Sequence, residues 1–258
     1  MLMLSQERQQ YIKDKIEKDG AVTTAALTKR FGVSLETIRR DLLTLEQDGI
    51  LKKVHGGAVR CEPMHIFRKL PQRLEENNDA KMRLAKTAVE YIDESDVIGI
   101  DSGSTAVSLA REIKGRFTSL TVVTHSLDVF SVLSGDRGIR LILCGGEYLE
   151  DEKAFYGPIT EAVLDGIFIN KMFLCPSAIS LKFGVCDWQS EMFSVQKKMA
   201  GRSETVYAIA DSSKFETKAL LKIGDASSFI YITDDALQDG IKELYAENAL
   251  KIITKPGE

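Results

Sequence analysis

The feature that most restricts the fold of this 258-residue chain is a series of short apolar runs from residue 97 onward. Most of these runs lack polar alternation, which is typical of strands covered by helices on both faces. Segments with helical spacing separate several of them, so the pattern predicts an α/β domain with a mostly parallel sheet. The seven predicted strands are residues 97–100, 120–124, 139–143, 171–175, 205–210, 229–233 and 251–253.

The residues that follow the first predicted strand are suited to an anion. Ligands of an open parallel sheet bind at the carboxyl ends of its strands. Here the strand is followed by Asp101, Ser102, Gly103, Ser104 and Thr105, directly before a helical pattern. Small hydroxyl residues and a glycine at a helix N-terminus present N–H and O–H donors, and the helix dipole adds to the attraction. The sequence thus predicts a site of phosphate size.

Three other strand ends carry residues suited to the same ligand. These residues are His125 and Ser126, Gly145 and Gly146, and Asp211 with Lys214. Lysine suits a phosphate, and the carboxylates of Asp101 and Asp211 suit hydroxyl groups. Each stretch has a simpler interpretation, since Ser-Gly-Ser is often only a turn, Asp211 could only cap a helix, and His125 could be an ordinary hydrogen-bonded loop residue. Together they favour a pocket for a phosphorylated, hydroxyl-rich small molecule.

Residues 34–57, SLETIRRDLLTLEQDGILKKVHGG, predict one amphipathic helix followed by a short basic ribbon. Apolar residues recur at helical spacing from Ile38 to Leu45, which leaves the opposite side of the helix free to contact another molecule. Ser34 is suited to cap the start of the helix, and Gly49 is suited to the left-handed residue that ends it. The stretch therefore contains its own start and stop signals.

This helix is predicted to be the second helix of a helix-turn-helix. Residues 24–31 form a shorter helical pattern upstream, and Gly32 supplies a tight turn, so the second helix would lie in the major groove of DNA. The predicted DNA contacts are Ser34, Thr37, Arg39 and Arg40 on this helix, and Lys53 and His55 on a two-stranded wing after it. Such charges often only solvate a surface. The combination of capped helix, glycine turn and basic Gly-Gly wing favours DNA.

Charge is divided unevenly along the chain. Residues 1–60 contain 11 Lys and Arg against 8 Asp and Glu, the remainder contains 23 against 30, and the formal net charge is −4. A mildly basic head on an acidic body fits a polyanion-binding module attached to a domain with another task. We predict a winged helix-turn-helix domain at residues 1–58, a linker at 59–77 and an α/β sensing domain at 78–258.

Several classes of protein are excluded by what the sequence lacks. The four cysteines, Cys61, Cys144, Cys175 and Cys186, form no C-x-x-C pair, and metal-ligand spacing is absent, so we predict no metal and no cofactor. Neither a Walker A loop nor a dinucleotide fingerprint occurs. No apolar run approaches the roughly 18–20 residues that span a bilayer. We expect a cytoplasmic protein with reduced thiols and no membrane partner.

Residues 37–59, TIRRDLLTLEQDGILKKVHGGAV, closely match the helix-turn-helix and wing signature of the DeoR family of bacterial transcription regulators, which the whole chain resembles. The body resembles the sensor domain of that family, whose fold is similar to that of ribose-5-phosphate isomerase. The matching stretches of the body are Arg73, Asn77 and Lys81 at four-residue steps, and residues 101–105, 124–126, 145–146, 211–215 and 232–234. The resemblance implies that Arg73 and Lys81 also contact the effector.

The resemblance implies an operator-binding regulator, usually a repressor, that a phosphorylated sugar releases from DNA. We therefore predict a repressor of a carbohydrate-catabolic operon that is not an enzyme and forms a homo-oligomer to read repeated half-sites. The alternative is a sugar-phosphate isomerase with an appended DNA-binding head, in which Asp101, Glu147 or Glu191 would supply the base. A body that only oligomerises, without a ligand, is a third interpretation.

The sequence departs from the family pattern in the predicted pocket. His125 stands where the family usually has asparagine, and Cys175 stands where a glycine is expected. Residues 184–187, GVCD, are also unusual. We therefore expect a changed pocket wall and assign no particular sugar phosphate.

Overall fold

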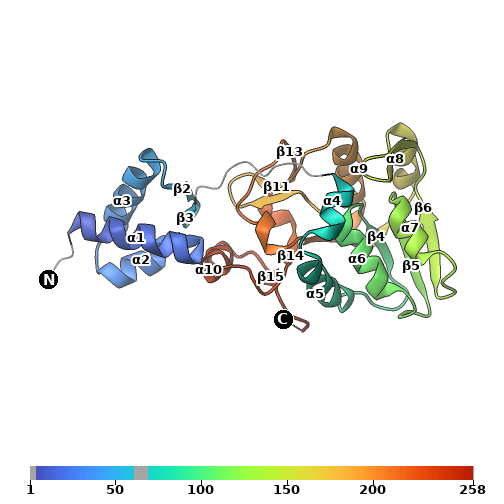
Figure 1. Ribbon diagram of the computed structural model, residues 1–258, viewed down its shortest axis with the longest axis horizontal. Coiled ribbons are helices and arrows are strands. Elements are labelled where there is room, and N and C mark those ends of the chain that lie inside the picture. Colours follow the sequence, from blue (N-terminus) through green and yellow to red (C-terminus); the bar gives the residue numbers. More distant parts are fainter. Residues whose placement is uncertain (1–3, 61–68, 258) are drawn as a thin grey trace.

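The computed structural model describes residues 4–60 and 69–257, which form a small N-terminal head and a larger body (Figure 1). The elements of the head are α1 (Ser5–Asp19), β1 (Ala21–Thr23), α2 (Thr24–Phe31), α3 (Leu35–Gln47), β2 (Leu51–Val54) and β3 (Gly57–Arg60). The strands pair antiparallel in the order β1-β3-β2, and the three helices share one apolar core with them. The predicted winged helix-turn-helix is confirmed, with β1 as a third strand beyond the predicted two-stranded wing.

Local signals define the ends of α3. The side chain of Ser34 accepts a hydrogen bond from the backbone N–H of Thr37 at 3.2 Å, which satisfies one of the donors that a first helical turn leaves unpaired. Gly49 follows the helix at φ +71°, a conformation that suits glycine because it has no Cβ. Both predicted signals of this helix are therefore confirmed.

The body contains a seven-stranded parallel sheet with the strand order β15-β14-β12-β9-β4-β5-β6. Its strands are β4 (Val97–Ile100), β5 (Leu120–Thr124), β6 (Ile139–Leu143), β9 (Ile169–Leu174), β12 (Ser203–Ile209), β14 (Ile230–Ile232) and β15 (Ile252–Ile253). Each one coincides with or overlaps a strand that the apolar runs predict. The predicted α/β domain with a parallel sheet is confirmed.

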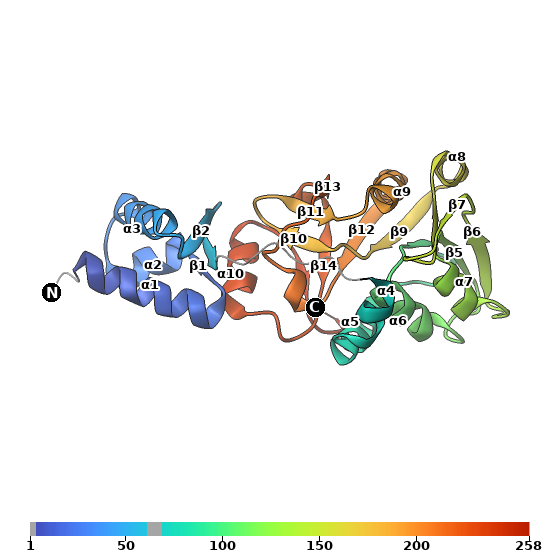
Figure 2. The ribbon, with the colours of Figure 1, turned by 45° about the horizontal axis from the view of Figure 1, so that its top comes forward.

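Helices cover both faces of this sheet. They are α4 (Leu70–Glu75), α5 (Asn78–Val89), α6 (Ser104–Ile113), α7 (Leu127–Leu133), α8 (Pro158–Asp165), α9 (Ser190–Gly201) and α10 (Asp239–Glu247), with the 3-10 helices η1 (Ser212–Lys214) and η2 (Ala226–Ser228). Figure 2 shows α5, α6 and α7 on one side and α8 and α9 on the other. Val122 and Val123 belong to different apolar clusters, because successive strand residues point to opposite faces. Within residues 4–60 and 69–257, no helix has both the length and the apolar character needed to cross a bilayer.

Two small antiparallel structures lie outside the predicted strands. One is a sheet with the order β10-β11-β13, and the other is the hairpin of β7 and β8. Their bounds are β7 (Glu147–Leu149), β8 (Ala154–Tyr156), β10 (Ala178–Ser180), β11 (Gly184–Asp187) and β13 (Leu221–Gly224). Runs of three or four residues are too short to show a periodicity, so pairing within the folded chain determines these strands.

The boundary between head and body differs from the predicted linker at residues 59–77. Val59 belongs to β3, and Leu70, which is 1 % exposed, begins α4 of the body. Residues 61–68, which include Cys61, lie outside the described residues. Val59 and Ala21 of the head are buried in the same apolar cluster as Ile241 and Leu244 of α10. The head therefore packs directly against the body.

Candidate functional sites

Helix α3 presents two of its predicted contact residues to solvent. Arg39 and Arg40 are exposed and Thr37 is half-buried, while the opposite side of the helix lies in the head core. Asp41 ties this buried side to α1, because its carboxylate accepts a hydrogen bond from Arg8 Nε at 2.7 Å. The head thus holds two guanidinium groups on one outward surface.

The wing lies beside the body. Lys53 is half-buried, the side chain of His55 is exposed, and the carbonyl of His55 accepts a hydrogen bond from Asn248 Nδ2, just after α10, at 3.1 Å. The ammonium of Lys52 lies 3.9 Å from the centroid of the Phe183 ring, which is a cation–π contact with the β10–β11 turn. The position of the wing therefore depends on the body.

A small cavity of about 40 Å³ lies at the carboxyl ends of β4, β9 and β12, and is called the strand-end cavity below. The predicted effector residues that line it are Arg73, Lys81, Gly103, Ser104, Thr105, Asp211 and Lys214. Gly103 takes φ +99° immediately before α6, and a Cβ at this position would lie 3.3 Å from Arg73 Nη1. Glycine thus leaves room for the guanidinium beside a helix N-terminus, which favours an anion.

Three basic side chains surround the strand-end cavity. Lys81 is 5 % exposed, and its ammonium donates to the backbone carbonyls of Arg73 and Glu76. Burial lowers the pKa of Lys81; the nearby charges of Lys214 and Arg73 lower it further, and Asp211 opposes them. An anion in the cavity would relieve the repulsion among the basic groups. The electrostatics of the cavity therefore favour a phosphate.

A narrower recess adjoins the strand-end cavity. It shares Arg73 with that cavity and also contains Ser102, Glu152 and Asp187. Glu152 forms an ion pair with Arg73. Burial raises the pKa of the carboxyl groups of Glu152 and Asp187. These groups can accept hydrogen bonds from ligand hydroxyls. Sequence reasoning missed both of them: the unusual GVCD stretch was a weak signal for Asp187, and nothing local marks Glu152.

Asp101 connects the strand ends and does not line the cavity. Its carboxylate is fully buried and accepts hydrogen bonds from Ser102 N at 2.7 Å, Cys175 N at 2.9 Å and Gln196 Nε2 at 3.0 Å. The Nε2 atom of His125 lies 3.0 Å from Asp101 Oδ1, the oxygen that also accepts from Ser102 N, while Cys175 N and Gln196 Nε2 donate to Oδ2. Each carboxylate oxygen thus has two protein partners. This corrects the prediction that Asp101 contacts ligand hydroxyls, because its acceptor capacity is used within the fold.

The residues that follow β5 and β6 also lie away from the strand-end cavity. His125 is 1 % exposed, and its Nδ1 atom is 2.9 Å from the carbonyl oxygen of Phe155. Ser126 caps α7, while Gly145 and Gly146 pack against α8. The physical reason is the strand order. Strands β5 and β6 lie on one side of β4, whereas β9 and β12 lie on its other side. None of these four predicted effector residues lines the strand-end cavity.

The described cysteines are buried or half-buried free thiols. Burial raises the pKa of Cys144 to about 11 and that of Cys175 well above its ordinary value, and it also raises the pKa of Cys186. A thiol needs its thiolate form to react, so these side chains serve packing. Cys175 nevertheless forms part of the wall of the strand-end cavity, where the family resemblance predicts a glycine.

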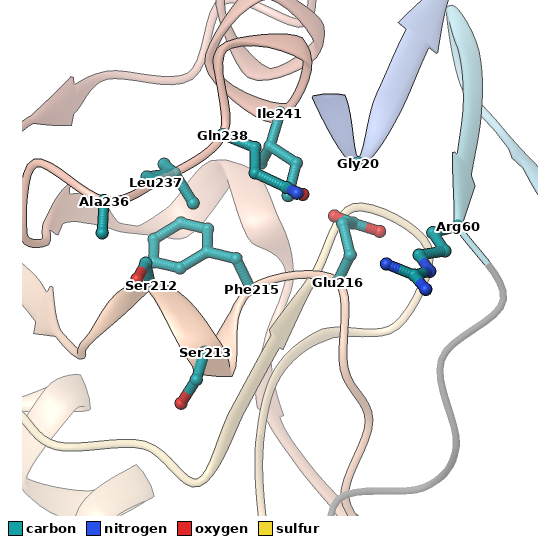
Figure 3. Close-up of a pocket in the computed structure, with 10 residues that line it drawn as sticks. All are labelled: Gly20, Arg60, Ser212, Ser213, Phe215, Glu216, Ala236, Leu237, Gln238 and Ile241. Carbon is teal, nitrogen blue, oxygen red and sulfur yellow. The ribbon is translucent and has the colours of Figure 1, made fainter. Parts of the chain in front are cut away.

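A larger cavity of about 320 Å³, called the junction cavity below, lies between the head and the body (Figure 3). Gly20 and Arg60 line it from the head, and Ser212 and Ser213 of η1 line it from the body. Lys214, the last residue of η1, lines the strand-end cavity. One short turn therefore separates the two cavities.

A winged helix-turn-helix joined to an α/β domain with an anion-suited cavity is the architecture of a transcription regulator with its own sensor domain. Residues 8–64 match the DeoR-like helix-turn-helix domain, and residues 76–236 match the DeoR C terminal sensor domain. The chain belongs to the DeoR family of DNA-binding transcription regulators.

Relatives of the chain carry the names of operon regulators. The L-fucose operon activator of Haemophilus influenzae is 31 % identical over 92 % of this chain and 94 % of its own length. The putative aga operon transcriptional repressor of Escherichia coli O157:H7 is 30 % identical over 89 % of this chain and 86 % of its own length. The ribose 5-phosphate isomerase A of Methanocaldococcus jannaschii is 19 % identical over 54 % of this chain and 55 % of its own, with a TM-score of 0.41. Family membership confirms the prediction of a regulator in preference to an enzyme.

Proposed function

We propose that this regulator represses a carbohydrate-catabolic operon, and that a phosphorylated sugar bound in the strand-end cavity releases it from its operator. The observation that carries this proposal is the convergence of Arg73, Lys81 and Lys214 at the first turn of α6. Three basic groups and a helix N-terminus are complementary to a phosphate, and the adjoining carboxyl groups of Glu152 and Asp187 suit sugar hydroxyls. The names of an aga operon repressor and a lactose phosphotransferase system repressor among the relatives support a sugar operon.

The same proposal includes a homo-oligomer that acts in the cytoplasm, where the chromosome of a bacterium lies. A two-fold oligomer would place two α3 helices on repeated half-sites, which is how dimeric helix-turn-helix proteins read palindromic operators. Sedimentation equilibrium of the full chain measures this directly, and a monomer at all concentrations that bind DNA would contradict it.

The proposed path from effector to DNA begins at η1. Asp211, just before η1, and Lys214, its last residue, line the strand-end cavity, whereas Ser212 lines the junction cavity. The carboxylate of Asp234 holds Ser212 through its N–H at 2.7 Å and its hydroxyl at 3.1 Å. A phosphate that attracts Lys214 would therefore displace η1, and Ser212 of η1 lines the junction cavity next to the head.

From η1 the path continues into α10 and the head. Glu216, directly after this turn, accepts a hydrogen bond from the hydroxyl of Tyr245 on α10 at 2.8 Å, and burial raises the pKa of this carboxyl group. Asn248 at the end of α10 donates to His55 of the wing, and the backbone at Gly240 lies against the head at Ala21. Effector binding can thus shift the head if the two arrangements of α10 differ in effector affinity.

Phosphorylated sugars are expected to stabilise the folded chain in a way that requires Lys214. A ligand at 100 times its Kd adds about 2.7 kcal/mol to the free energy of unfolding. For a body of this size, that raises the Tm by about 5–10 °C. A thermal-shift series with ribose 5-phosphate, other sugar phosphates and inorganic phosphate measures the effect, with unphosphorylated ribose as the negative control.

Lys214→Ala should remove most of that shift while leaving operator binding unchanged in the absence of ligand. Lys251→Ala is the matched control, since its side chain is exposed on the body and does not line the cavity. If Lys214→Ala leaves the operator at the same effector concentration as the unmodified chain, the effector does not bind in the strand-end cavity.

Arg40→Ala is expected to weaken operator binding by about 5- to 150-fold, because one bidentate contact to a base contributes about 1–3 kcal/mol. The fold should not change, since the side chain is exposed. A gel-shift titration at several salt concentrations measures the effect and separates a base contact from a phosphate contact, because losing a phosphate contact lowers the salt slope by about 1. Arg111→Ala removes one exposed cation from α6 and serves as control; equal affinities of the two variants would count against α3 in the groove.

A further inference from the structure

Two leucines lie on the outward surface of α3 among charged and polar side chains. Leu35 and Leu43 are each 42 % exposed, whereas Ile38, Leu42 and Leu45 of the same helix are at most 1 % exposed. Neither exposed leucine belongs to the apolar core of the head. Packing inside the head therefore does not account for an apolar residue at either position.

The two leucines form a row with Arg39. Positions 35, 39 and 43 are spaced at i, i+4 and i+8, and residues four apart lie one above another on a helix. Arg39 is exposed, and its ion pair with Glu36 spans 4.0 Å between two exposed side chains, so this pair contributes little and costs little to break. The row therefore consists of an apolar, a cationic and a second apolar side chain. It lies on the helix of the helix-turn-helix that is proposed to bind DNA.

This row matches the chemistry of one groove of DNA. In the major groove, the methyl group of thymine is the apolar feature of the base edges, and the N7 and O6 atoms of guanine accept two hydrogen bonds from arginine. Single exposed leucines are common on protein surfaces, where they touch only water. On a helix that enters the groove, an exposed leucine can instead bury a thymine methyl group.

The spacing of the leucines sets the spacing of their partners. Eight residues of α-helix rise by about 12 Å. Base pairs are stacked about 3.4 Å apart. A helix lying along the groove would therefore place the two leucines about three to four base pairs apart, with Arg39 between them.

We propose that Leu35 and Leu43 recognise the 5-methyl groups of two thymines about three to four base pairs apart in each half-site, with Arg39 on a guanine between them. This inference rests on the proposed binding of α3 to operator DNA. It adds the operator chemistry that the helix selects.

The first experiment identifies the half-site without knowledge of the target genes. The full chain selects from a library of random duplexes, and the enriched sequences are expected to contain a guanine flanked by thymines at the stated spacing. Each thymine is then replaced by deoxyuridine, which removes only the methyl group. Each of the two replacements should weaken binding by about fourfold, the effect of exposing one methyl-sized group.

Leucine variants connect each methyl group to its partner. Leu35→Ala and Leu43→Ala should each bind the thymine operator several-fold more weakly, and each should become insensitive to deoxyuridine at one of the two positions. Leu220→Ala is the matched control, because it removes a leucine that is 70 % exposed on the body. Circular dichroism checks that the variants keep their helices.

The outcomes separate the two levels of the proposal. Enrichment of a specific duplex whose binding ignores deoxyuridine, or leucine variants that keep the full deoxyuridine effect, would overturn the thymine recognition while leaving operator binding intact. No enrichment of any sequence would overturn both.

Discussion

Replacing Asp41 with alanine is expected to unfold the head while leaving the body folded. Arg8 and Asp41 are 8 % and 3 % exposed, and their side chains are joined by hydrogen bonds of 2.7 Å and 3.2 Å. The same carboxylate accepts a third hydrogen bond from Ser5 Oγ at 2.9 Å. Removing it leaves a buried guanidinium without its carboxylate, which costs about 3–5 kcal/mol. A domain of about 60 residues buries too little apolar surface to tolerate that loss.

Hydrogen exchange measured peptide by peptide tests this expectation. Protection should be lost in α1 and α3 and kept in the strands of the body, and the variant should no longer bind any duplex. Asp48→Ala removes an exposed acid just after α3 and is expected to have little effect. The double variant Arg8→Met with Asp41→Leu should recover protection, because apolar residues can replace a buried ion pair without loss of stability. Full protection of α3 in Asp41→Ala would show that the pair is dispensable.

The head illustrates what local sequence can and cannot predict. Helix α3 was predictable in both position and exposed surface, since Ser34 and Gly49 act on the backbone within a few residues of themselves. The ion pair of Arg8 and Asp41 was not, because it joins residues 33 positions apart. Strand β1 is three residues long and exists through its pairing with β3, so no periodicity could reveal it.

The body shows the same division between local and non-local information. Continuous apolar runs predicted all seven strands of the parallel sheet. A strand that is buried on both faces needs apolar residues at successive positions, so each strand shows this pattern in its own sequence. The order of those strands was not predictable, and it decides which strand ends meet. It brings the loops at Ser104, Cys175 and Lys214 together and leaves His125 and Gly145 behind them. The residue types therefore indicated an anion site from sequence alone, whereas which of these residues share a cavity depended on the fold.

Gly240→Ala is expected to separate the effector response from DNA binding. A Cβ on Gly240 would lie 2.3 Å from the carbonyl oxygen of Ala21 and 2.7 Å from that of Asp19, and both belong to the backbone of the head. Backbone atoms in a packed element cannot move aside as the end of a side chain can, so α10 and the head must part. The intrinsic affinity of α3 for DNA should stay the same, because α10 packs against β1 and α1 of the head, while the outward residues of α3 are exposed.

The separation should appear in two measurements. Small-angle scattering should give a larger radius of gyration for Gly240→Ala, and saturating effector should no longer change its operator affinity, whereas a coupling of about 1–3 kcal/mol gives the unmodified chain a response of about 5- to 150-fold. Gly201→Ala at the end of α9 is the matched control, since a Cβ there meets no atom within 4 Å. A variant that keeps the larger radius and still answers to effector would exclude α10 as the connection, because a signal carried by packing cannot cross a contact that has opened. Loss of the response with the control unaffected would instead locate the coupling at α10, where the sensor domain packs on β1 and where the following Asn248 donates a hydrogen bond to the wing.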